Sequence, residues 1–153
     1  MTKKQKKSAY LDPLHSIGYL SRINFRAFNK ALEQLIAPHK VSQGQWRFLR
    51  VLWEENGLTQ KDLSDRVGIT EATTVNGVLG LEEAGLVTRR KSKVDARKMM
   101  VRLTPKARSL RNKLIPMVVK VNEQALKGIK KKDIVVARRV LTQTFNNLTS
   151  EDD

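Results

Sequence analysis

Residues 57–103 have the sequence GLTQKDLSDRVGITEATTVNGVLGLEEAGLVTRRKSKVDARKMMVRL, and this stretch decides the fold. Thr59 and Thr70 each precede a short segment with helical apolar spacing, as helix N-caps do. Gly68 lies between the two segments, where a glycine favours the end of a helix. Two short helices joined by a tight turn that contains glycine form a helix-turn-helix, and the stretch therefore predicts that motif.

The apolar period changes after the second of these helices. That helix is predicted to bury a stripe and to stop at Gly85; the stripe consists of Val75, Val78 and Leu81. Residues 86–89 and 99–103 instead alternate apolar and polar side chains, as half-buried strands do. A β-hairpin, or wing, is therefore expected after the helix-turn-helix, and residues 38–103 are predicted to form a winged helix-turn-helix lobe.

The segments that flank this lobe are predicted to be helical. Asp12-Pro13 and Thr104-Pro105 each place a capping side chain before a proline, an order typical of a helix start. The helix after Asp12 has an apolar surface wider than one small domain covers, so part of it is expected to meet another subunit. Residues 11–37 and 104–149 are thus predicted to form a helical dimerisation lobe, and the fold class is mainly α with a small β-hairpin.

The charge of the chain is strongly positive and unevenly distributed. Thirty Lys and Arg against fifteen Asp and Glu give a net charge of +15 over 153 residues. Between Arg89 and Arg111 lie ten basic residues, and only Asp95 opposes them. A membrane-binding protein would place such charge on an amphipathic helix, whereas here it lies on a hairpin beside a helix-turn-helix, where it can reach phosphates. Double-stranded DNA is therefore the expected partner, with a solvated basic surface as the alternative.

Several other functional classes are disfavoured. The chain has no cysteine, which excludes disulfides and thiol chemistry. His15 and His39 do not fit a metal-ligand pair, and no catalytic constellation or phosphate-binding glycine loop stands out, so we expect no metal, no cofactor and no enzyme. Residues 1–10 are expected to be a disordered basic arm and not a secretory signal, and residues 150–153 an acidic tail. Without an apolar run of membrane-spanning length, the protein is expected to be cytoplasmic.

Four segments of the chain resemble the MarR family of bacterial regulators. Residues 57–70 are similar to the first part of that family's helix-turn-helix, and residues 81–87 resemble its helix-to-strand junction. The wing is similar in its Asp95-x-Arg97 and in the stretch Val101-Arg102-Leu103-Thr104-Pro105-Lys106-Ala107-Arg108. The helix arrangement agrees from about Leu11 to Leu148.

The resemblance implies how such a protein would meet DNA. It implies a homodimer held by the first and the last two helices, with recognition helices in successive major grooves and wings in minor grooves. Two copies of one helix related by a two-fold axis match half-sites about one helical turn apart. Arg97 is the implied wing-tip contact, with Asp95 holding the loop through an ion pair. The predicted wing contacts are Arg89, Arg90, Lys91, Lys93, Asp95, Arg97 and Lys98.

The predicted recognition helix departs from the family pattern. Asn76 stands where a basic residue is common, and Leu79 and Gly80 replace positions that are often polar. Gly77 and Gly80 permit a close approach of backbone to DNA, or they leave the helix partly ordered until it binds, or they are tolerated surface substitutions; the sequence leaves these three alternatives open. Base contacts are predicted for a set that contains no arginine for guanine: Thr70, Glu71, Thr73, Thr74 and Asn76.

An effector site is a further implication of the resemblance, because MarR-like proteins often bind small aromatic or anionic molecules between the dimer helices and the DNA-binding lobe. Aromatic walls and a partner for a carboxylate are available in Tyr19, Arg22, Trp46 and Arg50. The alternative, favoured by ordinary burial statistics, is that Trp46 and Tyr19 belong to the core and the arginines are solvated.

Three functional hypotheses follow. The first is a homodimeric, sequence-specific transcriptional regulator on a pseudo-palindromic operator, modulated by a small effector. The second is an architectural DNA-binding protein with little sequence preference, suggested by the glycines and the missing arginine of the recognition helix. The third is a protein-interaction module that reuses the winged-helix fold, since a fold does not dictate a function.

Overall fold

The computed structural model describes residues 12–150, so the predicted basic arm and all but the first residue of the predicted acidic tail lie outside the described residues. The secondary structure is mostly helical with one small sheet. The elements in chain order are η1 (Pro13–His15), α2 (Ile17–Ile36), η2 (Ala37–His39), α3 (Gln43–Glu54), β1 (Leu58–Thr59), α4 (Gln60–Val67), α5 (Glu71–Glu83), β2 (Val87–Lys91), β3 (Met99–Leu103), α6 (Pro105–Ala125) and α7 (Lys131–Thr149). The predicted class, mainly α with a β-hairpin, is confirmed.

The helix-turn-helix forms where the caps predicted it. The Thr59 hydroxyl accepts a hydrogen bond from the Asp62 backbone N–H (3.0 Å) at the start of α4. Thr70 does the same for Thr73 (3.2 Å) at the start of α5. Gly68 ends α4 in the left-handed region (φ +75°), which a residue without a Cβ adopts at low cost. The two helices are thereby held at a tight turn, with α5 as the second helix.

The wing belongs to a three-stranded antiparallel sheet in the order β1-β3-β2. In the β2–β3 hairpin, Val87 faces Leu103 and Lys91 faces Met99. The strand β1, which the sequence did not predict, pairs Leu58 with Val101. Because only two residues pair, β1 carries no alternating pattern that could reveal it.

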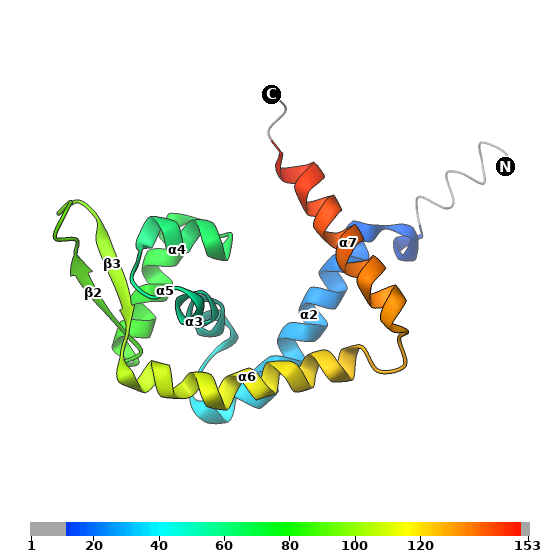
Figure 1. Ribbon diagram of the computed structural model, residues 1–153, viewed down its shortest axis with the longest axis horizontal. Coiled ribbons are helices and arrows are strands. Elements are labelled where there is room, and N and C mark those ends of the chain that lie inside the picture. The colour runs from blue at the N-terminus through cyan, green and yellow to red at the C-terminus, as the bar shows by residue number, and fades with distance from the viewer. Residues whose placement is uncertain (1–11, 151–153) are drawn as a thin grey trace.

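One continuous core joins the lobe to the flanking helices. Its largest fully buried side chain is Phe48 of α3, which lies among Leu49, Leu63, Leu81 and other apolar residues. The indole N–H of Trp53 donates to the Ala107 carbonyl (2.9 Å), which ties α3 to the start of α6. The long helix α6 continues through Pro116 and leads away from the lobe toward α2 and α7 (Figure 1).

The end of the molecule formed by α2, α7 and the second half of α6 is open. None of the described residues of α7 is buried, although that helix carries Val135, Leu141, Phe145 and Leu148. Figure 1 shows α7 projecting from the end of α6 on the side remote from the wing. Within the part of the chain that the structure describes, no helix combines the length and apolarity that a membrane span requires.

Candidate nucleic-acid interface

The helix α5 presents one side to the core and the other to solvent. Thr74, Val78 and Leu81 are buried, at positions i, i+4 and i+7. At about 100° per residue, the opposite side of the helix is centred on Ala72, Asn76, Leu79 and Glu83. All four of those residues are exposed.

The predicted base-contact residues of α5 divide between these sides. Thr70, Glu71, Thr73 and Asn76 are exposed. Thr74 is fully buried, and its hydroxyl donates to the Thr70 carbonyl (3.0 Å), so the prediction that Thr74 contacts bases is wrong. The Thr70 and Thr73 hydroxyls lie 2.9 Å apart and cap the helix, which leaves Asn76 as the predicted polar residue at the centre of the outward side.

The apolar spacing groups Val75 with Val78 and Leu81, but Val75 is not buried with them. Val75 and Leu79 are each 37% exposed; Ala72 and Leu79 lie on the outward side of α5, and Val75 lies at the edge of that side. Apolar residues occur all around this helix, so spacing alone did not separate Val75 from the buried residues. The buried partners of Val78 and Leu81 were needed to fix the rotation of the helix.

Gly77 and Gly80 have different roles. A Cβ atom on Gly77 would lie well inside van der Waals distance of the Phe48 ring, so α5 touches α3 at that point. Gly77 is therefore a packing residue of the lobe, and neither a close approach to DNA nor a tolerated surface substitution accounts for it. Around Gly80, no described atom lies within 4 Å of an added Cβ. Gly80 therefore remains compatible with a surface role.

The wing tip is ordered by its own hydrogen bonds. The Asp95 carboxylate accepts from the Arg97 backbone N–H (3.1 Å) and from the Arg97 guanidinium through Nε (3.1 Å) and Nη2 (3.2 Å). These bonds, the side-chain one foremost, lower the pKa of Asp95 and keep it ionised. The Arg97 side chain is nevertheless 91% exposed, so the pair holds a cation outward at the tip.

The loop behind the tip carries further contacts and one residue that the sequence analysis missed. The Ser92 hydroxyl accepts from the backbone N–H groups of Val94 (3.2 Å) and Asp95 (3.3 Å). Val94 is 98% exposed, the only strongly apolar side chain among residues 90–98. An apolar residue in an otherwise polar turn was the signal that could have identified it. The remaining predicted contacts of the wing are all exposed: Arg90, Lys91, Lys93 and Lys98.

Arg89 differs from the other wing residues because it is held inward. Its Nε donates to Glu82 Oε2 (2.8 Å), and its backbone N–H reaches Glu82 Oε1 (3.3 Å). The Arg89 guanidinium, chiefly through this side-chain hydrogen bond, lowers the pKa of Glu82. Since Glu82 lies in α5 and Arg89 in β2, the pair braces the wing against the helix. We therefore assign Arg89 to positioning the wing, in place of the predicted direct contact.

Comparison with known proteins agrees with this geometry. Residues 41–99 match the model of the MarR family. The chain is 26% identical to a MarR transcriptional regulator from Methanosarcina mazei Go1, with a TM-score of 0.79 over 86% of this chain and 94% of that one. Residues 41–99 are therefore a MarR-family segment, and the fold of the chain is that of MarR regulators.

Two further proteins are similar to this chain. It is 35% identical over 88 residues to the HTH-type transcriptional regulator TtmR of Methylorubrum extorquens, an alignment that spans 58% of this chain and 45% of TtmR. It shares its fold, at a TM-score of 0.81 and 22% identity, with a Listeria monocytogenes protein of this family complexed with 26mer DNA, over 87% of this chain and 89% of that one. The relatives are regulators of transcription, in agreement with the prediction that the chain is not an enzyme.

The four predicted effector residues differ in burial and in the side chains that they contact. Trp46 is buried and packs edge-on against Trp53, with ring centroids 5.6 Å apart, which agrees with the core alternative. Arg22 lies over the half-buried Tyr19 ring, 5.4 Å from its centroid. Arg50 is exposed on α3.

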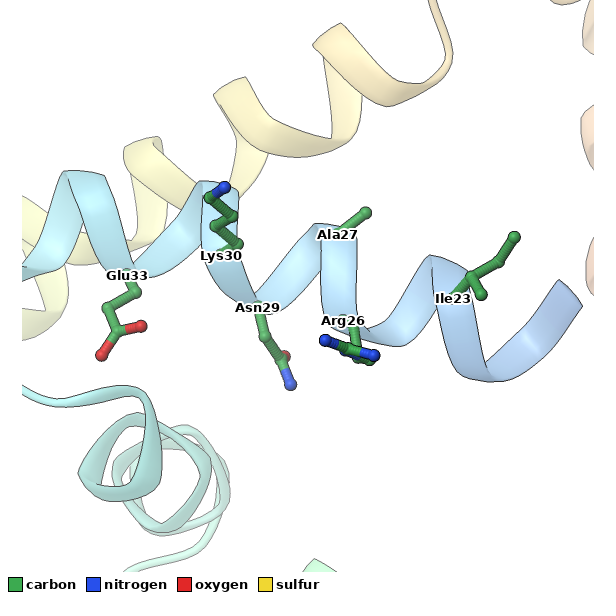
Figure 2. A pocket seen from close by; sticks show the side chains of 6 residues that line it. All are labelled: Ile23, Arg26, Ala27, Asn29, Lys30 and Glu33. Atoms are coloured by element: carbon green, nitrogen blue, oxygen red, sulfur yellow. The ribbon is translucent and has the colours of Figure 1, made fainter. Parts of the chain in front are cut away.

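A hollow of about 490 Å³ lies along α2. Figure 2 shows Arg26, Asn29 and Glu33 on the side of α2 that faces α3. The hollow is lined by Ile23, Arg26, Ala27, Asn29, Lys30 and Glu33, and thus by one helix only. Since ligand sites normally enclose most of a ligand, the hollow is a surface depression in the single chain. Among the described residues, no group of three or more His, Cys, Asp or Glu is arranged to hold a metal ion.

The contact at Gly77 predicts opposite effects for two alanine substitutions in α5. Gly77→Ala is expected to lower the free energy of unfolding by about 1–3 kcal/mol, because the added methyl overpacks Phe48. Gly80→Ala is expected to raise it by up to about 1 kcal/mol, because alanine favours a helix and the space is open. Urea unfolding of both variants measures the difference. Equal effects of the two substitutions would contradict the packing role of Gly77.

Proposed function

We propose that this chain is a transcriptional regulator that binds a pseudo-palindromic operator in double-stranded DNA as a homodimer. The observation that carries the proposal is the wing tip, where Asp95 holds the exposed Arg97 outward at the end of the hairpin that follows α5. A rigid cation beside a helix that fits a major groove is suited to the phosphates and the adjacent minor groove. The Listeria monocytogenes protein, which shares this fold, is complexed with 26mer DNA, and this supports DNA as the partner.

The distribution of charge supports DNA as the partner. The exposed wing residues Arg90, Lys91, Lys93 and Lys98 continue the basic surface of Arg97, and the chain as a whole carries +15. Neutralising phosphates releases counterions, so such contacts supply affinity that falls steeply with salt. A protein-interaction module would not require this surface, which is why we favour the DNA-binding hypothesis over it.

The homodimer is supported by the apolar surface at the open end of the molecule. Leu141, Phe145 and Leu148 are exposed at positions i, i+4 and i+7 of α7, and Phe25 is exposed on α2. Between α2, the end of α6 and α7 lies a mainly apolar groove of about 600 Å³, which includes Phe28, Leu126 and Leu141. An apolar surface of this extent marks an interaction site, and a second copy of the same helices covers it in an isologous dimer.

Control by a small aromatic or anionic effector is the last part of the proposal. A structural neighbour, CouR from Rhodococcus jostii RHA1, is bound to p-coumaroyl-CoA, at 22% identity to this chain. In the single chain, the hollow on α2 is open on the side of α3, and Arg26 offers a cation to an anionic ligand there (Figure 2). The effector remains a prediction, and we place it at that open side because the buried Trp46 cannot line an accessible site.

Competition between DNA fragments tests the function. Purified protein is incubated with a labelled fragment from the region around its own coding sequence, and unlabelled random duplex is added. We expect a specific-to-random affinity ratio of at least about 10³, as is normal for regulators. A ratio near one would instead show the architectural protein of the second hypothesis, and a binding constant that does not vary with salt would favour the protein-interaction module.

Removal of the wing-tip cation is expected to weaken DNA binding. Arg97→Ala removes an exposed guanidinium without touching the core, so binding should fall by about tenfold while the fold is retained. Fluorescence anisotropy at several salt concentrations measures this, and the slope of log K against log salt should decrease by about one per lost contact. Lys40→Ala, an exposed lysine in the turn after η2, is the control. Unchanged affinity of Arg97→Ala would exclude the wing tip from the interface.

A charge on the apolar stripe of α7 is expected to separate the subunits. Phe145→Glu alters a side chain that is 65% exposed in the single chain, so the protomer should fold, whereas burial of an unpaired charge in the dimer is costly. Light scattering should show a shift from dimer to monomer. Gln143→Glu adds the same charge to an exposed position on the other side of α7 and should remain dimeric. Dimers for both variants would rule out this surface.

A further inference from the structure

The outward side of α5 is chemically unusual for a surface that meets DNA. Ala72 and Leu79 are exposed there, Val75 is exposed at the edge of that side, and Asn76 lies between Ala72 and Leu79 along the helix. The first two turns of a recognition helix are the part that contacts base edges, and three of these four residues belong to them. The chemistry available to bases in the major groove is therefore mainly methyl groups and one carboxamide.

Guanine recognition is disfavoured on this helix. The commonest contact to guanine is a bidentate Arg or Lys, and residues 71–83 contain neither. The nearby Arg89 is bound to Glu82 and is half-buried, so it does not supply the missing fork.

Adenine and thymine match the groups that are present. A thymine displays its C5-methyl in the major groove, where alanine and other apolar side chains contact it. Asparagine can bond adenine at N6 and N7 with one carboxamide. Val75 and Leu79 are each 37% exposed in the single chain, and thymine methyls would remove that exposed apolar surface from water.

We infer that α5 selects A·T pairs in the half-site, with Val75 and Leu79, flanked by Ala72, contacting thymine C5-methyl groups and Asn76 bonding adenine. This inference rests on the proposed function and specifies its DNA sequence class. It also accounts for how a helix without arginine selects a sequence: the wing supplies affinity through phosphates and α5 supplies the preference.

The acidic residues of α5 orient the helix in the groove. Glu83 lies on the outward side at the C-terminal end, and its carboxylate is repelled by phosphate. Glu71 lies in the first turn of α5, off the outward side, and the helix dipole stabilises it there. The repulsion at Glu83 keeps the C-terminal end of α5 away from the backbone, so that the end with Ala72, Val75 and Asn76 enters the groove.

The experiment begins with selection of duplexes by the full-length protein from a random-sequence library. We expect the enriched half-sites to contain A·T pairs at the major-groove positions that the protein protects from modification. In the selected duplex, each protected thymine is then replaced by deoxyuridine, which removes the methyl group alone. Each replacement at a contacted position should weaken binding about fourfold, the effect of one buried methyl group. Replacement outside the protected half-sites should have no effect.

Two variants assign the effect to residues. Val75→Ala/Leu79→Ala shortens the two exposed side chains, and its affinity should no longer respond to deoxyuridine. Val119→Ala shortens an exposed valine of α6, outside the candidate interface, and should retain the full response. Enrichment of G·C pairs, or a wild-type affinity that ignores deoxyuridine, would overturn the inference and leave the proposed function standing. A library from which nothing is enriched would overturn the proposed function itself.

Discussion

The contact between Gly77 of α5 and Phe48 of α3 is the constraint on which the DNA-facing surface depends. Because there is no room for a Cβ atom, α5 lies directly on the Phe48 ring, and this sets both its distance from the core and its rotation. Thr74, Val78 and Leu81 then point inward. The residues that remain outside are those available to a groove, so a packing contact inside the lobe determines which side chains can meet bases.

The wing is positioned by electrostatics, in contrast to the packing that positions α5. Glu82 and Arg89 connect the end of α5 to β2, and Asp95 and Arg97 shape the loop. In both pairs the carboxylate accepts hydrogen bonds from backbone and side chain of the same arginine. Ordering the loop before binding reduces the conformational entropy that is lost when DNA is bound. One arginine is held inward and the other outward, and only the surroundings of each decide its role.

The sequence was sufficient for those features that local chemistry determines. Threonine caps, Gly68 and the change from helical to alternating spacing predicted the helix-turn-helix and the wing, both of which are confirmed. The sequence was insufficient where contacts between different helices and strands decide the position of a side chain. Val75 and Val78 are both valines in one helix, and only contacts with α3 and α4 separate them. The inward position of Arg89 depends on Glu82 in another element, and the two-residue strand β1 depends on Val101, which is distant in sequence; neither contact leaves a periodic signal.

The two ends of the molecule satisfy opposite physical requirements. The lobe has a closed core and an exposed basic wing, whereas α7 has no buried residue in the described chain and carries large apolar side chains outward. A single copy thus leaves apolar area in water at one end and concentrates positive charge at the other. In the proposed dimer a second copy would cover this apolar area, but it would double the charge, and repulsion within such a pair grows accordingly. DNA that lies across both wings would lower that repulsion, so in the proposed complex dimerisation and DNA binding favour each other energetically.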